Sequence, residues 1–585
     1  MGNWRFYARS LDLLSRGLWS VGRSAVLAPR AAQGPGRNPV RRKRGAWHIP
    51  FTCVGLITGS EAMADCASLM KAAFPDTDIR QVQSVASGAF APSDQSGAPV
   101  AVFRELPAFC RVVGVIRPTS DSEIGFELWL PDVWNGRYLQ TGNGGFAGLI
   151  NYGGLVPGLR NEFAVASTDD GHTGSGAAWA LGHPEKVIDY GYRAVHLTSV
   201  VAKQITTAYY GRALSHTYFS GCSGGGRESL MEAQRYPDDF DGWVVGAPGN
   251  DFTGVMTHLL NLALTAASMT EPLTGGQLQA LSRAALAQCD AADGIVDGVI
   301  ENPLQCRFDP AVVQCKGAPD GKCLSERQVQ AVSRVYDDAR GGRARTRLTP
   351  GFRVALGDEA AQWPLWVRPV SKDSGHAIAL SQMFSENFWP YMVYGDPKLD
   401  FRKLDLLEAA TQSRSRTGAT LNAVDPDLSA VRAAGKKIIQ YHGWADAVIP
   451  AQYSIGYYEA VAQYLGRENQ DFYRLFMAPG MEHCGGGPGP NAFGTPYDPR
   501  PFGAGYDPSR EFNPEHHVLA ALLRWVENGE APERIVATKY QDDDAAKRVL
   551  RTRPLCVYPK VARWTGNGST DDAKNFVCSG SGRLY

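Results

Sequence analysis

The segment YFSGCSGGGRES, residues 218–229, places one serine, Ser223, between glycines. Residues 221–225 match the pattern G-x-S-x-G, with a strand-like run before them and a helix-like run after them. In that context the serine lies on a sharp turn and acts as a nucleophile. The N–H of Gly224, at the positive end of the following helix, then faces the place where an oxyanion would form. Because the pattern also arises by chance in a chain with 64 glycines, the prediction depends on this context.

A nucleophilic serine needs a base, and the base needs an acid that orients it. Asp446 in QYHGWADAVIP (440–450) follows one strand-like run, and His483 in FMAPGMEHCGGG (476–487) follows the next. The order Ser, Asp, His is the one used by α/β-hydrolases. We therefore predict Ser223 as the nucleophile, His483 as the base and Asp446 as its orienting acid. His442 is an alternative base, but its position at the end of a strand is more typical of a packed, hydrogen-bonded histidine.

A cysteine adjoins each half of the predicted Ser–His pair, because Cys222 precedes Ser223 and Cys484 follows His483. The serine and histidine must approach to about 3 Å to share a proton. That approach brings the two cysteines within reach of a disulfide. The chain has eleven cysteines; without Cys53, which lies in the leader described next, ten remain. An even number favours disulfides formed in an oxidising compartment, and no cysteines have zinc-ligand spacing.

The N-terminal segment differs from the rest of the chain. Its first 45 residues hold ten Arg or Lys and one acid, and a short apolar run (49–57) and Ala62-Met63-Ala64 follow. This pattern predicts an export signal within residues 1–64, cleaved after Ala64. A disordered basic tail is the alternative, and a start near Val40 would leave a conventional signal. No other stretch approaches ~20 apolar residues, so we expect a secreted or periplasmic protein without a membrane span.

The whole chain of 585 residues has 59 basic and 59 acidic side chains. This balance argues against nucleic acid or an anionic membrane as a partner. Strand-like runs occur at 137–142, 162–169, 216–221, 436–443 and 473–480, and helix-like runs at 187–211, 452–466 and 517–529. The alternation indicates a parallel sheet covered by helices on both faces. We predict one α/β catalytic domain, residues 65–251 and 426–585, interrupted by a lid domain, 252–425. Two unrelated domains would leave each half-sheet with an open edge.

The stretches GCSGGGR, YHGWADAVIP, PGMEHCGGGPG and WVENGEAPERI resemble the tannase and feruloyl esterase family of α/β-hydrolases, and the resemblance covers residues 66–580. That family also contains mono(2-hydroxyethyl) terephthalate hydrolase. The resemblance implies an α/β-hydrolase fold with a large inserted lid, and it implies that Cys222–Cys484 is the family's bridge between the two catalytic loops. It also implies four further disulfides: Cys66–Cys110, Cys289–Cys306, Cys315–Cys323 and Cys556–Cys578. The second oxyanion donor is expected in TGNGGFAG (141–148), and the family pattern assigns it to the N–H of Gly145, with Gly144 less favoured.

An acidic loop in CDAADGIVDGVIENPLQC (289–306) carries Asp290, Asp293 and Asp297. Carboxylate oxygens at short spacing suit Ca²⁺, although the twelve-residue EF-hand pattern is missing. By composition alone a solvated acidic turn is the more common explanation. The resemblance instead implies a structural Ca²⁺ held by these three aspartates and the carbonyls of Ile295 and Val299. No cofactor is expected for the chemistry itself.

The predicted lid is rich in aromatic residues that suit an aromatic acyl group: Trp363, Trp366, Phe384, Phe388, Trp389 and Tyr391. Each of them also fits the core of the lid. No arginine occurs between Arg368 and Arg402, which disfavours an acyl group with a free carboxylate. We expect a serine esterase for small-molecule esters of hydroxycinnamic or hydroxybenzoic acids, of the feruloyl type. Tannase activity, terephthalate-type activity, acyl transfer to an alcohol and a catalytically silent binding protein remain alternatives. The sequence does not determine the oligomeric state.

Overall fold

The computed structural model describes residues 65–92, 100–318, 320–342, 345–349, 355–368, 378–466, 469–503 and 505–580. All of them belong to one compact unit, Met63–Leu584. The predicted export signal and its cleavage site lie outside the described residues. In the described part of the chain no helix is long and apolar enough to cross a membrane.

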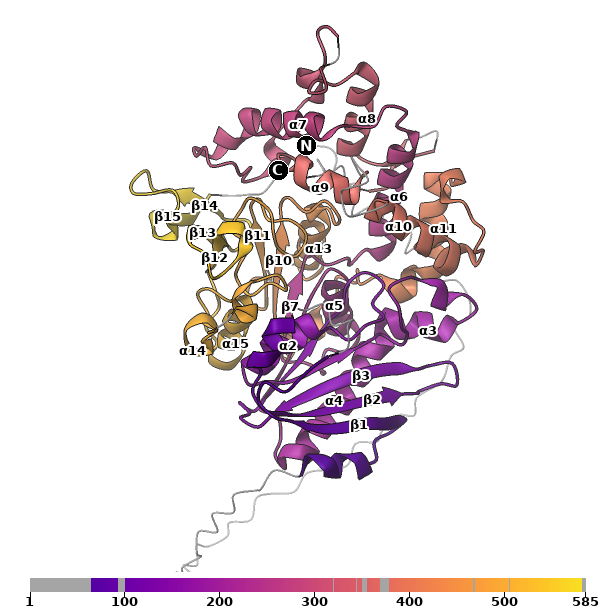
Figure 1. The fold of residues 1–585 in the computed structure, drawn as a ribbon, viewed down its shortest axis with the longest axis vertical. Coiled ribbons are helices and arrows are strands. Elements are labelled where there is room, and N and C mark those ends of the chain that lie inside the picture. Colours follow the sequence, from indigo (N-terminus) through magenta and orange to yellow (C-terminus); the bar gives the residue numbers. More distant parts are fainter. Residues whose placement is uncertain are drawn as a thin grey trace, which may run out of the picture. The chain divides into compact units, whose positions relative to one another are not determined.

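A nine-stranded sheet forms the centre of this unit, in the strand order β1-β2-β3-β5-β4-β6-β7-β10-β11 (Figure 1). Its strands are β1 (Thr77–Val85), β2 (Phe109–Ile116), β3 (Ile124–Pro131), β4 (Arg137–Thr141), β5 (Ala164–Thr168), β6 (His216–Cys222), β7 (Gly242–Gly246), β10 (Lys437–Gly443) and β11 (Tyr473–Ala478). The five strand-like runs of the sequence correspond to β4, β5, β6, β10 and β11. From β5 through β11 neighbouring strands pair in parallel, as the alternation predicted.

The sheet is mixed rather than wholly parallel. Strands β1, β2, β3 and β5 pair antiparallel, and β1 to β3 were not predicted from the sequence. Only a short turn separates β2 from β3, whereas parallel neighbours need a crossover of a dozen or more residues. These two strands therefore pair antiparallel.

Helices cover both faces of the sheet because successive strand residues point to opposite sides. Phe219 and Ile438 belong to a hydrophobic cluster with α4, α5 and α13, whereas Tyr218 and Ile439 belong to another with α2 and α15. These helices are α2 (Tyr152–Arg160), α4 (Ala194–Tyr210), α5 (Gly224–Arg235), α13 (Ala451–Tyr464) and α15 (Val518–Asn528). The short helix α3 (Pro184–Ile188) precedes α4, and α14 (Pro508–Glu511) precedes α15.

Between β7 and β10 the described chain adds no strand to the central sheet. This segment contains α6 (Phe252–Ser268), α7 (Gly275–Cys289), α8 (Glu326–Tyr336), α9 (Glu359–Trp366), α10 (Leu380–Asn387), α11 (Leu406–Leu421), α12 (Ser429–Ala433) and the short pair β8 (Arg340–Gly341) and β9 (Thr346–Arg347). Helices α6 to α9 lie above the sheet in Figure 1. Most of the segment packs around a third hydrophobic cluster, which also includes Ala447, Val448 and Ile449 from the loop after β10. The limits 252 and 425 of a separate lid domain stay a prediction.

The C-terminal segment adds two small antiparallel sheets beside the central one. They are formed by β12 (Arg534–Tyr540) with β13 (Val549–Cys556), and by β14 (Val561–Trp564) with β15 (Phe576–Ser579). Five disulfides join the ten cysteines of the described chain, which confirms the predicted pairs: Cys66–Cys110, Cys222–Cys484, Cys289–Cys306, Cys315–Cys323 and Cys556–Cys578.

Candidate active site

Ser223 lies on a strained turn between β6 and α5. Its φ of 63° and ψ of −118° place a non-glycine residue in a sparsely populated region, which is typical of a nucleophile elbow. A Cβ on Gly221 would lie 2.4 Å from the carbonyl oxygen of Gly225, so the turn requires a glycine at this position. The Ser223 N–H donates to the carbonyl of Gly246 on β7, at 3.0 Å. The turn thus holds the serine at the carboxyl end of the parallel strands.

Asp446 and His483 follow β10 and β11, and the structure joins them directly. His483 Nδ1 lies 2.7 Å from Asp446 Oδ2, and the Asp446 side chain is fully buried. Its other oxygen, Oδ1, accepts the N–H groups of Val448 (2.8 Å) and Ile449 (2.9 Å). Burial alone would raise the pKa of Asp446, but His483 and His442 hold that pKa well below its usual range. The carboxylate is therefore ionised, and it fixes the Nδ1 proton of His483 so that Nε2 is left to accept a proton.

His442 has a different environment from His483. Its ring is completely buried, with Nδ1 at 2.6 Å from Ser454 Oγ and Nε2 at 2.8 Å from the carbonyl of Ile449. Nε2 also lies 3.2 Å from Asp446 Oδ2. Since both ring nitrogens are engaged inside the protein, His442 supports the Asp446 loop and is not available to a substrate.

The disulfide Cys222–Cys484 joins the two loops that carry Ser223 and His483. The Cα atoms of the two cysteines are 6.0 Å apart. Cys484 has a φ of 64°, so on the histidine side too a non-glycine residue has a positive φ. Each sulfur belongs to the chain neighbour of a predicted catalytic residue, and the bridge holds the elbow and the base loop together.

The loop after β4 lies against the elbow and offers backbone donors. A Cβ on Gly224 would be 3.5 Å from the Gly145 carbonyl oxygen and 3.2 Å from that of Asn143. Within the described chain the N–H groups of Gly145 and Gly224 donate to no protein acceptor. Gly145 has a φ of 59°, and the hydroxyl of Tyr190 donates to its carbonyl at 2.9 Å. The arrangement leaves both predicted oxyanion donors available beside Ser223.

Two buried carboxyl groups, those of Glu228 and Asp170, lie beside the loop after β4. Glu228 Oε2 accepts the Asn143 N–H at 3.1 Å, and the buried carboxyl of Asp170 lies near it. Burial raises the pKa of both groups, and the charge of Glu228 raises that of Asp170 further. Arg227 next to Glu228 donates to the carbonyls of Tyr190 and Gly191. These interactions fix the position of the glycine loop relative to α5.

The geometry of the site and the matches to known proteins together assign this chain to a family. Residues 110–579 match the family model described as tannase and feruloyl esterase. The chain belongs to the tannase and feruloyl esterase family. It is 40% identical over 555 residues to an uncharacterized esterase of Xanthomonas campestris pv. campestris, covering 90% of this chain and 93% of that protein. It is 33% identical over 478 residues to a probable feruloyl esterase B-1 of Aspergillus fumigatus, covering 80% and 85%.

Among solved structures, feruloyl esterase B from Aspergillus oryzae is similar at a TM-score of 0.77 and 30% identity, covering 88% of this chain and 99% of that one. Together with the mixed central sheet, this likeness establishes the α/β-hydrolase fold. Members of the tannase and feruloyl esterase family are carboxylic-ester hydrolases. The hydrogen bond between His483 and Asp446, on a loop that Cys222–Cys484 ties to the Ser223 turn, agrees with such chemistry.

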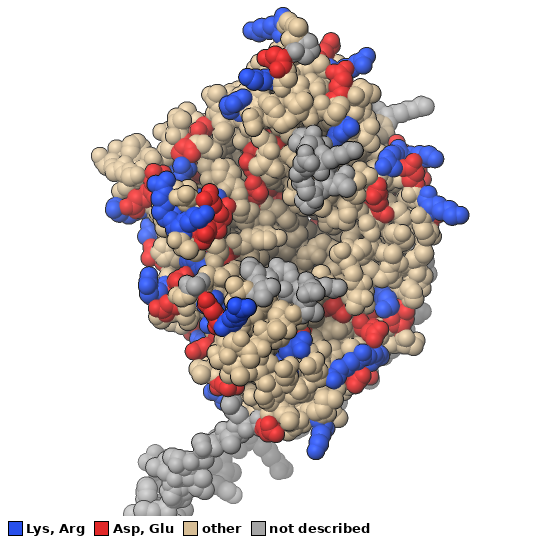
Figure 2. Space-filling view, viewed as in Figure 1, with Lys and Arg blue, Asp and Glu red and all other residues tan. Residues whose placement is uncertain are grey.

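Only some of the aromatic residues named from the sequence lie near the predicted catalytic residues of this family member. Trp366 meets the His483 ring edge-on at a centroid distance of 6.1 Å, and Phe384 approaches within 3.7 Å of where a Cβ on Gly145 would lie. Trp363, Phe388 and Trp389 are buried in the lid cluster, and Tyr391 packs against it. Figure 2 shows a hollow in the middle of this face, between the helices above and the sheet below, and the described residues visible on its floor are uncharged. Trp366 and Phe384 are thus the aromatic candidates for an acyl pocket.

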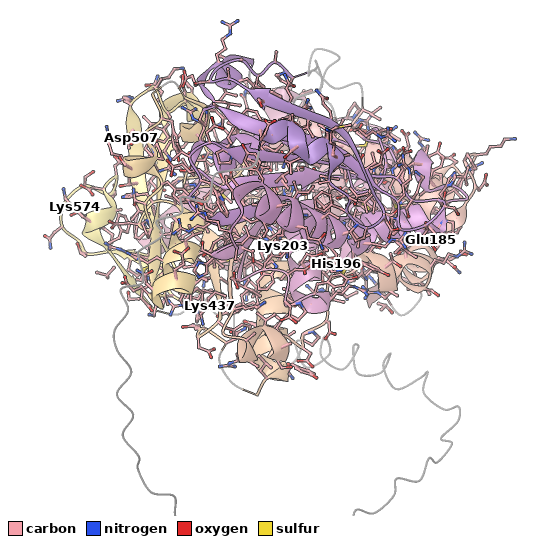
Figure 3. All side chains as sticks on the ribbon, turned by 90° about the horizontal axis from the view of Figure 1, so that it is seen from below. Glu185, His196, Lys203, Lys437, Asp507 and Lys574 are labelled. Atoms are coloured by element: carbon pink, nitrogen blue, oxygen red, sulfur yellow. A yellow bond between two sulfur atoms is a disulfide. The ribbon has the colours of Figure 1, made fainter. Side chains whose placement is uncertain are left out.

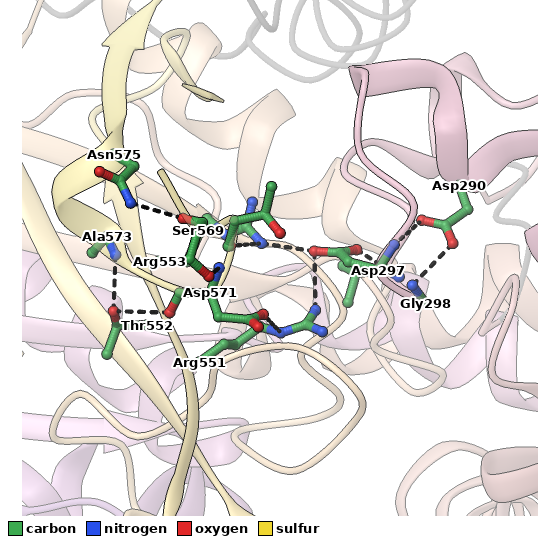
Figure 4. Close-up of polar contacts among 12 residues, drawn as sticks. Asp290, Asp297, Gly298, Arg551, Thr552, Arg553, Ser569, Asp571, Ala573 and Asn575 are labelled. Atoms are coloured by element: carbon green, nitrogen blue, oxygen red, sulfur yellow. Dashed lines mark hydrogen bonds and ion pairs between the residues drawn. The ribbon is translucent and has the colours of Figure 1, made fainter. Parts of the chain in front are cut away.

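The acidic loop of the predicted calcium site adopts a compact turn between α7 and Cys306. Asp290 accepts the N–H groups of Asp297 (3.2 Å) and Gly298 (2.9 Å), and Asp297 Oδ2 lies 2.7 Å from Arg553 Nη2 and 2.9 Å from Arg551 Nη1 (Figure 4). Asp293 Oδ1 accepts the N–H of Ile295 at 2.9 Å. In the part of the chain that the structure describes, the carbonyls of Ile295 and Val299 accept no hydrogen bond.

The donor set fits a calcium ion in part. Two backbone carbonyls are available, and the three carboxylates belong to one loop. Burial, and after it the charges of Asp297 and Asp290, raise the pKa of Asp293. The sequence reasoning missed Glu301, which is half-buried near the same carboxylates; burial first, and then Asp293, raises its pKa to about 8. Two arginines pair with one oxygen of Asp297, and its other oxygen accepts the N–H of Val299 at 3.1 Å, so both guanidinium groups reduce the affinity of this aspartate for a cation.

A second acidic group lies elsewhere, between α4 and α5. Within the described residues, His196, Glu232 and Asp239 bring their possible ligand atoms within 4.8 Å of one another. His196 Nδ1 is 2.6 Å from Asp239 Oδ2, and Lys203 Nζ is 3.7 Å from Asp239 Oδ1. His196 and Lys203 both extend from α4 (Figure 3). An ammonium group thus already accompanies these carboxylates, which reduces their affinity for a metal cation.

Sequence reasoning also missed several residues around the catalytic loops. His258 on α6 is buried, forms a hydrogen bond with the backbone of Ala447 and lies close to Asp446, and burial lowers its pKa to about 4. Gln362 on α9 donates to the carbonyl of Ala445 at 2.7 Å. These residues come from the segment between β7 and β10, and no local pattern links them to the base. Arg227 and Glu228, which support the glycine loop, did have a sequence signal. The stretch GGGRES places these two charged residues directly after the nucleophile turn.

Proposed function

We propose that this protein is an exported serine esterase that cleaves esters of aromatic acids of the feruloyl type through an acyl-enzyme. The hydrogen bond from His483 Nδ1 to the buried Asp446 carboxylate, on a loop tied to the Ser223 elbow by Cys222–Cys484, is the observation that supports it best. A binding protein on a hydrolase fold has no need for an ionised, fully buried acid that orients a histidine.

In the first half-reaction the Ser223 Oγ attacks the ester carbonyl carbon and its proton moves to His483 Nε2. The carbonyl oxygen becomes an oxyanion and accepts hydrogen bonds from the N–H groups of Gly145 and Gly224. Collapse of the tetrahedral intermediate breaks the bond to the alkoxy oxygen. That oxygen takes the proton from His483 and leaves as the alcohol.

In the second half-reaction water attacks the acyl-enzyme. His483 Nε2 accepts the proton of the water, and a second tetrahedral intermediate forms on the same two N–H groups. Its collapse releases the carboxylic acid, and His483 returns the proton to Ser223. Asp446 stays ionised throughout because its pKa is low, and its carboxylate stabilises the imidazolium that forms in each step.

The acyl group is proposed from the lining of the site. Trp366 and Phe384 offer aromatic surfaces near His483 and Gly145 that suit a phenyl ring. No arginine occurs between Arg368 and Arg402. A free acyl carboxylate would remain unpaired there, at a cost of several kcal/mol. Neutral phenolic acids are favoured over terephthalate for this reason.

Purified protein assayed with methyl ferulate, methyl gallate, mono(2-hydroxyethyl) terephthalate and a p-nitrophenyl ester tests the proposal. We expect the highest kcat/KM with methyl ferulate, and a loss of about 10⁴-fold or more in kcat for Ser223→Ala. A preference for the gallate or terephthalate ester would replace the substrate assignment. New esters formed in added alcohol would indicate acyl transfer. Wild-type protein inert toward all four, or an Ser223→Ala variant as active as wild type, would overturn the proposal.

We further propose a structural Ca²⁺ at Asp290, Asp293 and Asp297, with the carbonyls of Ile295 and Val299. The two free carbonyls and the position of the three aspartates on one loop support it, although within the described residues only His196, Glu232 and Asp239 bring three ligand atoms within 4.8 Å of one another; no catalytic step needs the ion. Export is proposed from the basic leader together with five disulfides, which persist in oxidising compartments. N-terminal sequencing of protein recovered outside the cytoplasm should give Asp65 as the first residue.

A further inference from the structure

The peptide group that follows Gly145 is held by a side chain. A turn begins at Gly144, whose carbonyl accepts the N–H of Ala147 at 2.9 Å, and Gly145 is its second residue, with a φ of 59°. The peptide group after Gly145 is therefore the central one of the turn. Within the described residues its carbonyl accepts one hydrogen bond, which comes from the Tyr190 hydroxyl at 2.9 Å. A single side chain thus holds the carbonyl of this peptide group.

Backbone hydrogen bonds fix the ends of the loop after β4 but not its central peptide group. The N–H of Gly142 donates to the Ser220 carbonyl at 3.0 Å. On the other side the N–H of Gly148 donates to the Asp169 carbonyl, also at 3.0 Å. Both anchors lie three residues from Gly145. Because glycine accepts a wide range of backbone angles, the peptide groups beside Gly145 can turn while these anchors stay in place.

The orientation of this carbonyl matters because it lies beside the second proposed oxyanion donor. Its oxygen is 3.5 Å from the place where a Cβ on Gly224 would lie. A carbonyl oxygen carries a partial negative charge, so it would repel an oxyanion if it turned toward that position. The Gly145 N–H and carbonyl meet at one Cα atom. A bond that fixes the carbonyl therefore also restricts the direction of the N–H.

Tyr190 itself has little freedom to move. It is 1% exposed and lies in one turn of π-helix, Asp189–Arg193, between α3 and α4. Such turns occur frequently at functional sites. The guanidinium of Arg227 on α5, which is fully buried, lies 4.7 Å from the centre of the Tyr190 ring and donates to the Tyr190 carbonyl at 2.9 Å. Burial raises the pKa of Tyr190, so the hydroxyl keeps its proton and remains a donor.

We propose that Tyr190 is a positioning residue of the oxyanion hole, whose hydroxyl holds the Gly145 peptide so that the Gly145 N–H faces the developing oxyanion. The inference rests on the proposed esterase function. Tyr190 acts through the backbone of Gly145 and not on the substrate. Because the oxyanion exists only in the tetrahedral intermediate, loss of the hydroxyl should lower kcat and leave KM nearly unchanged. Removal of a whole oxyanion donor costs about 10²–10³ in kcat, and a donor that is retained but misdirected should cost about tenfold.

The test compares Tyr190→Phe with Tyr210→Phe, since each variant removes one buried hydroxyl that donates to a backbone carbonyl. The Tyr210 hydroxyl donates to the carbonyl of Pro131 at 2.6 Å. Pro131 ends β3, which runs antiparallel to β5, so it lies at the sheet edge opposite to the Ser223 turn. Both variants should lose a similar amount of melting temperature. With methyl ferulate at pH 7, kcat of the folded fraction should fall about tenfold in Tyr190→Phe and stay within about threefold of wild type in Tyr210→Phe.

A transition-state analogue separates positioning from a general structural effect. The ketone 4-(3,4-dimethoxyphenyl)-1,1,1-trifluorobut-3-en-2-one adds the Ser223 Oγ to its carbonyl carbon, the serine proton moves to His483, and the ketone oxygen becomes an oxyanion. Its Ki should rise about as much as kcat falls in Tyr190→Phe and should not change in Tyr210→Phe. The acid limb of kcat/KM, which reports the protonation of His483, should be the same in both variants and wild type.

Two results would overturn the inference. One is a kcat and a ketone Ki in Tyr190→Phe that both match those of Tyr210→Phe. The other is a shifted acid limb with an unchanged ketone Ki, which would place the effect on the base. Melting temperatures and active-site titration verify that folded protein is measured in each case. Failure of the proposed function is distinct, since wild type would then show no Ser223-dependent hydrolysis at pH 7.

Discussion

Replacing both Cys222 and Cys484 by alanine is expected to reduce kcat much more than removing another disulfide with a comparable effect on stability. The bridge spans a sequence separation of 262 residues. Loop-closure entropy alone then gives about 5–6 kcal/mol of stabilisation. The bridge Cys66–Cys110 spans 44 residues, which gives about 4 kcal/mol by the same relation. The two double variants should therefore lose a similar amount of unfolding free energy.

Their effects on the reaction should differ because only Cys222 and Cys484 adjoin residues of the proposed catalytic pair. A displacement of about 1 Å between Ser223 and His483 costs on the order of a hundredfold in rate. We expect kcat of the folded fraction to fall by about that factor in Cys222→Ala/Cys484→Ala. Cys66→Ala/Cys110→Ala, which alters the contact of the N-terminal segment with β2, should keep kcat within about threefold of wild type.

The assay combines active-site titration of the folded fraction with denaturant unfolding of both variants. Peptide mapping of the oxidised wild-type protein must also recover Cys222 linked to Cys484. Equal losses of kcat in the two variants would show that the bridge acts only through stability. Full kcat in Cys222→Ala/Cys484→Ala would refute the positional role.

Two other predictions concern the calcium loop and the acyl pocket. Chelation with EDTA should lower the melting temperature and leave kcat of the folded protein unchanged, because a ligand at a hundredfold excess over its Kd adds about 2.7 kcal/mol to the folded state. The melting temperature of Asp293→Ala should not change on addition of EDTA. If neither EDTA nor added Ca²⁺ changes the melting temperature of the wild type, the calcium site is refuted. Phe384→Ala should raise KM for methyl ferulate about tenfold but not for p-nitrophenyl acetate, because the loss is of aromatic contact area. Phe388→Ala, which opens a cavity in the lid core, should instead lower stability by about 3–5 kcal/mol with a smaller change in KM, and equal KM effects of the two variants would argue against Phe384 as a pocket wall.

Local sequence patterns were sufficient for the elements that carry the proposed triad. Strand, tight turn and helix around Ser223 are encoded within a few residues, and the loops of Asp446 and His483 each follow a short apolar run. The pairing of Cys222 with Cys484 followed from those positions, because catalytic contact brings chain neighbours together.

Residues that act across long sequence distances could not be predicted in this way. Gln362 contacts Ala445 across 83 residues, and Trp366 on the same helix meets the ring of His483. Their partners become visible only once the segment after β7 is folded onto the base loop. The antiparallel strands β1 and β3 were missed for another reason, because neither shows the alternation that marks a half-exposed strand. β3 is buried along almost its whole length, whereas most residues of β1 are exposed or half-buried.

The pairing of β7 with β10 has a consequence for how such an enzyme can change during evolution. Trp243 on β7 and Ile438 on β10 are direct neighbours in the sheet, although the whole segment from α6 to α12 lies between them in sequence. The segment thus leaves and rejoins the sheet at adjacent strands. Because the entropy of closing a loop grows only slowly with its length, this segment can be lengthened, shortened or exchanged at little cost to the sheet. A new segment would bring a new acyl specificity, provided that it keeps a helix able to contact both catalytic loops as α9 does.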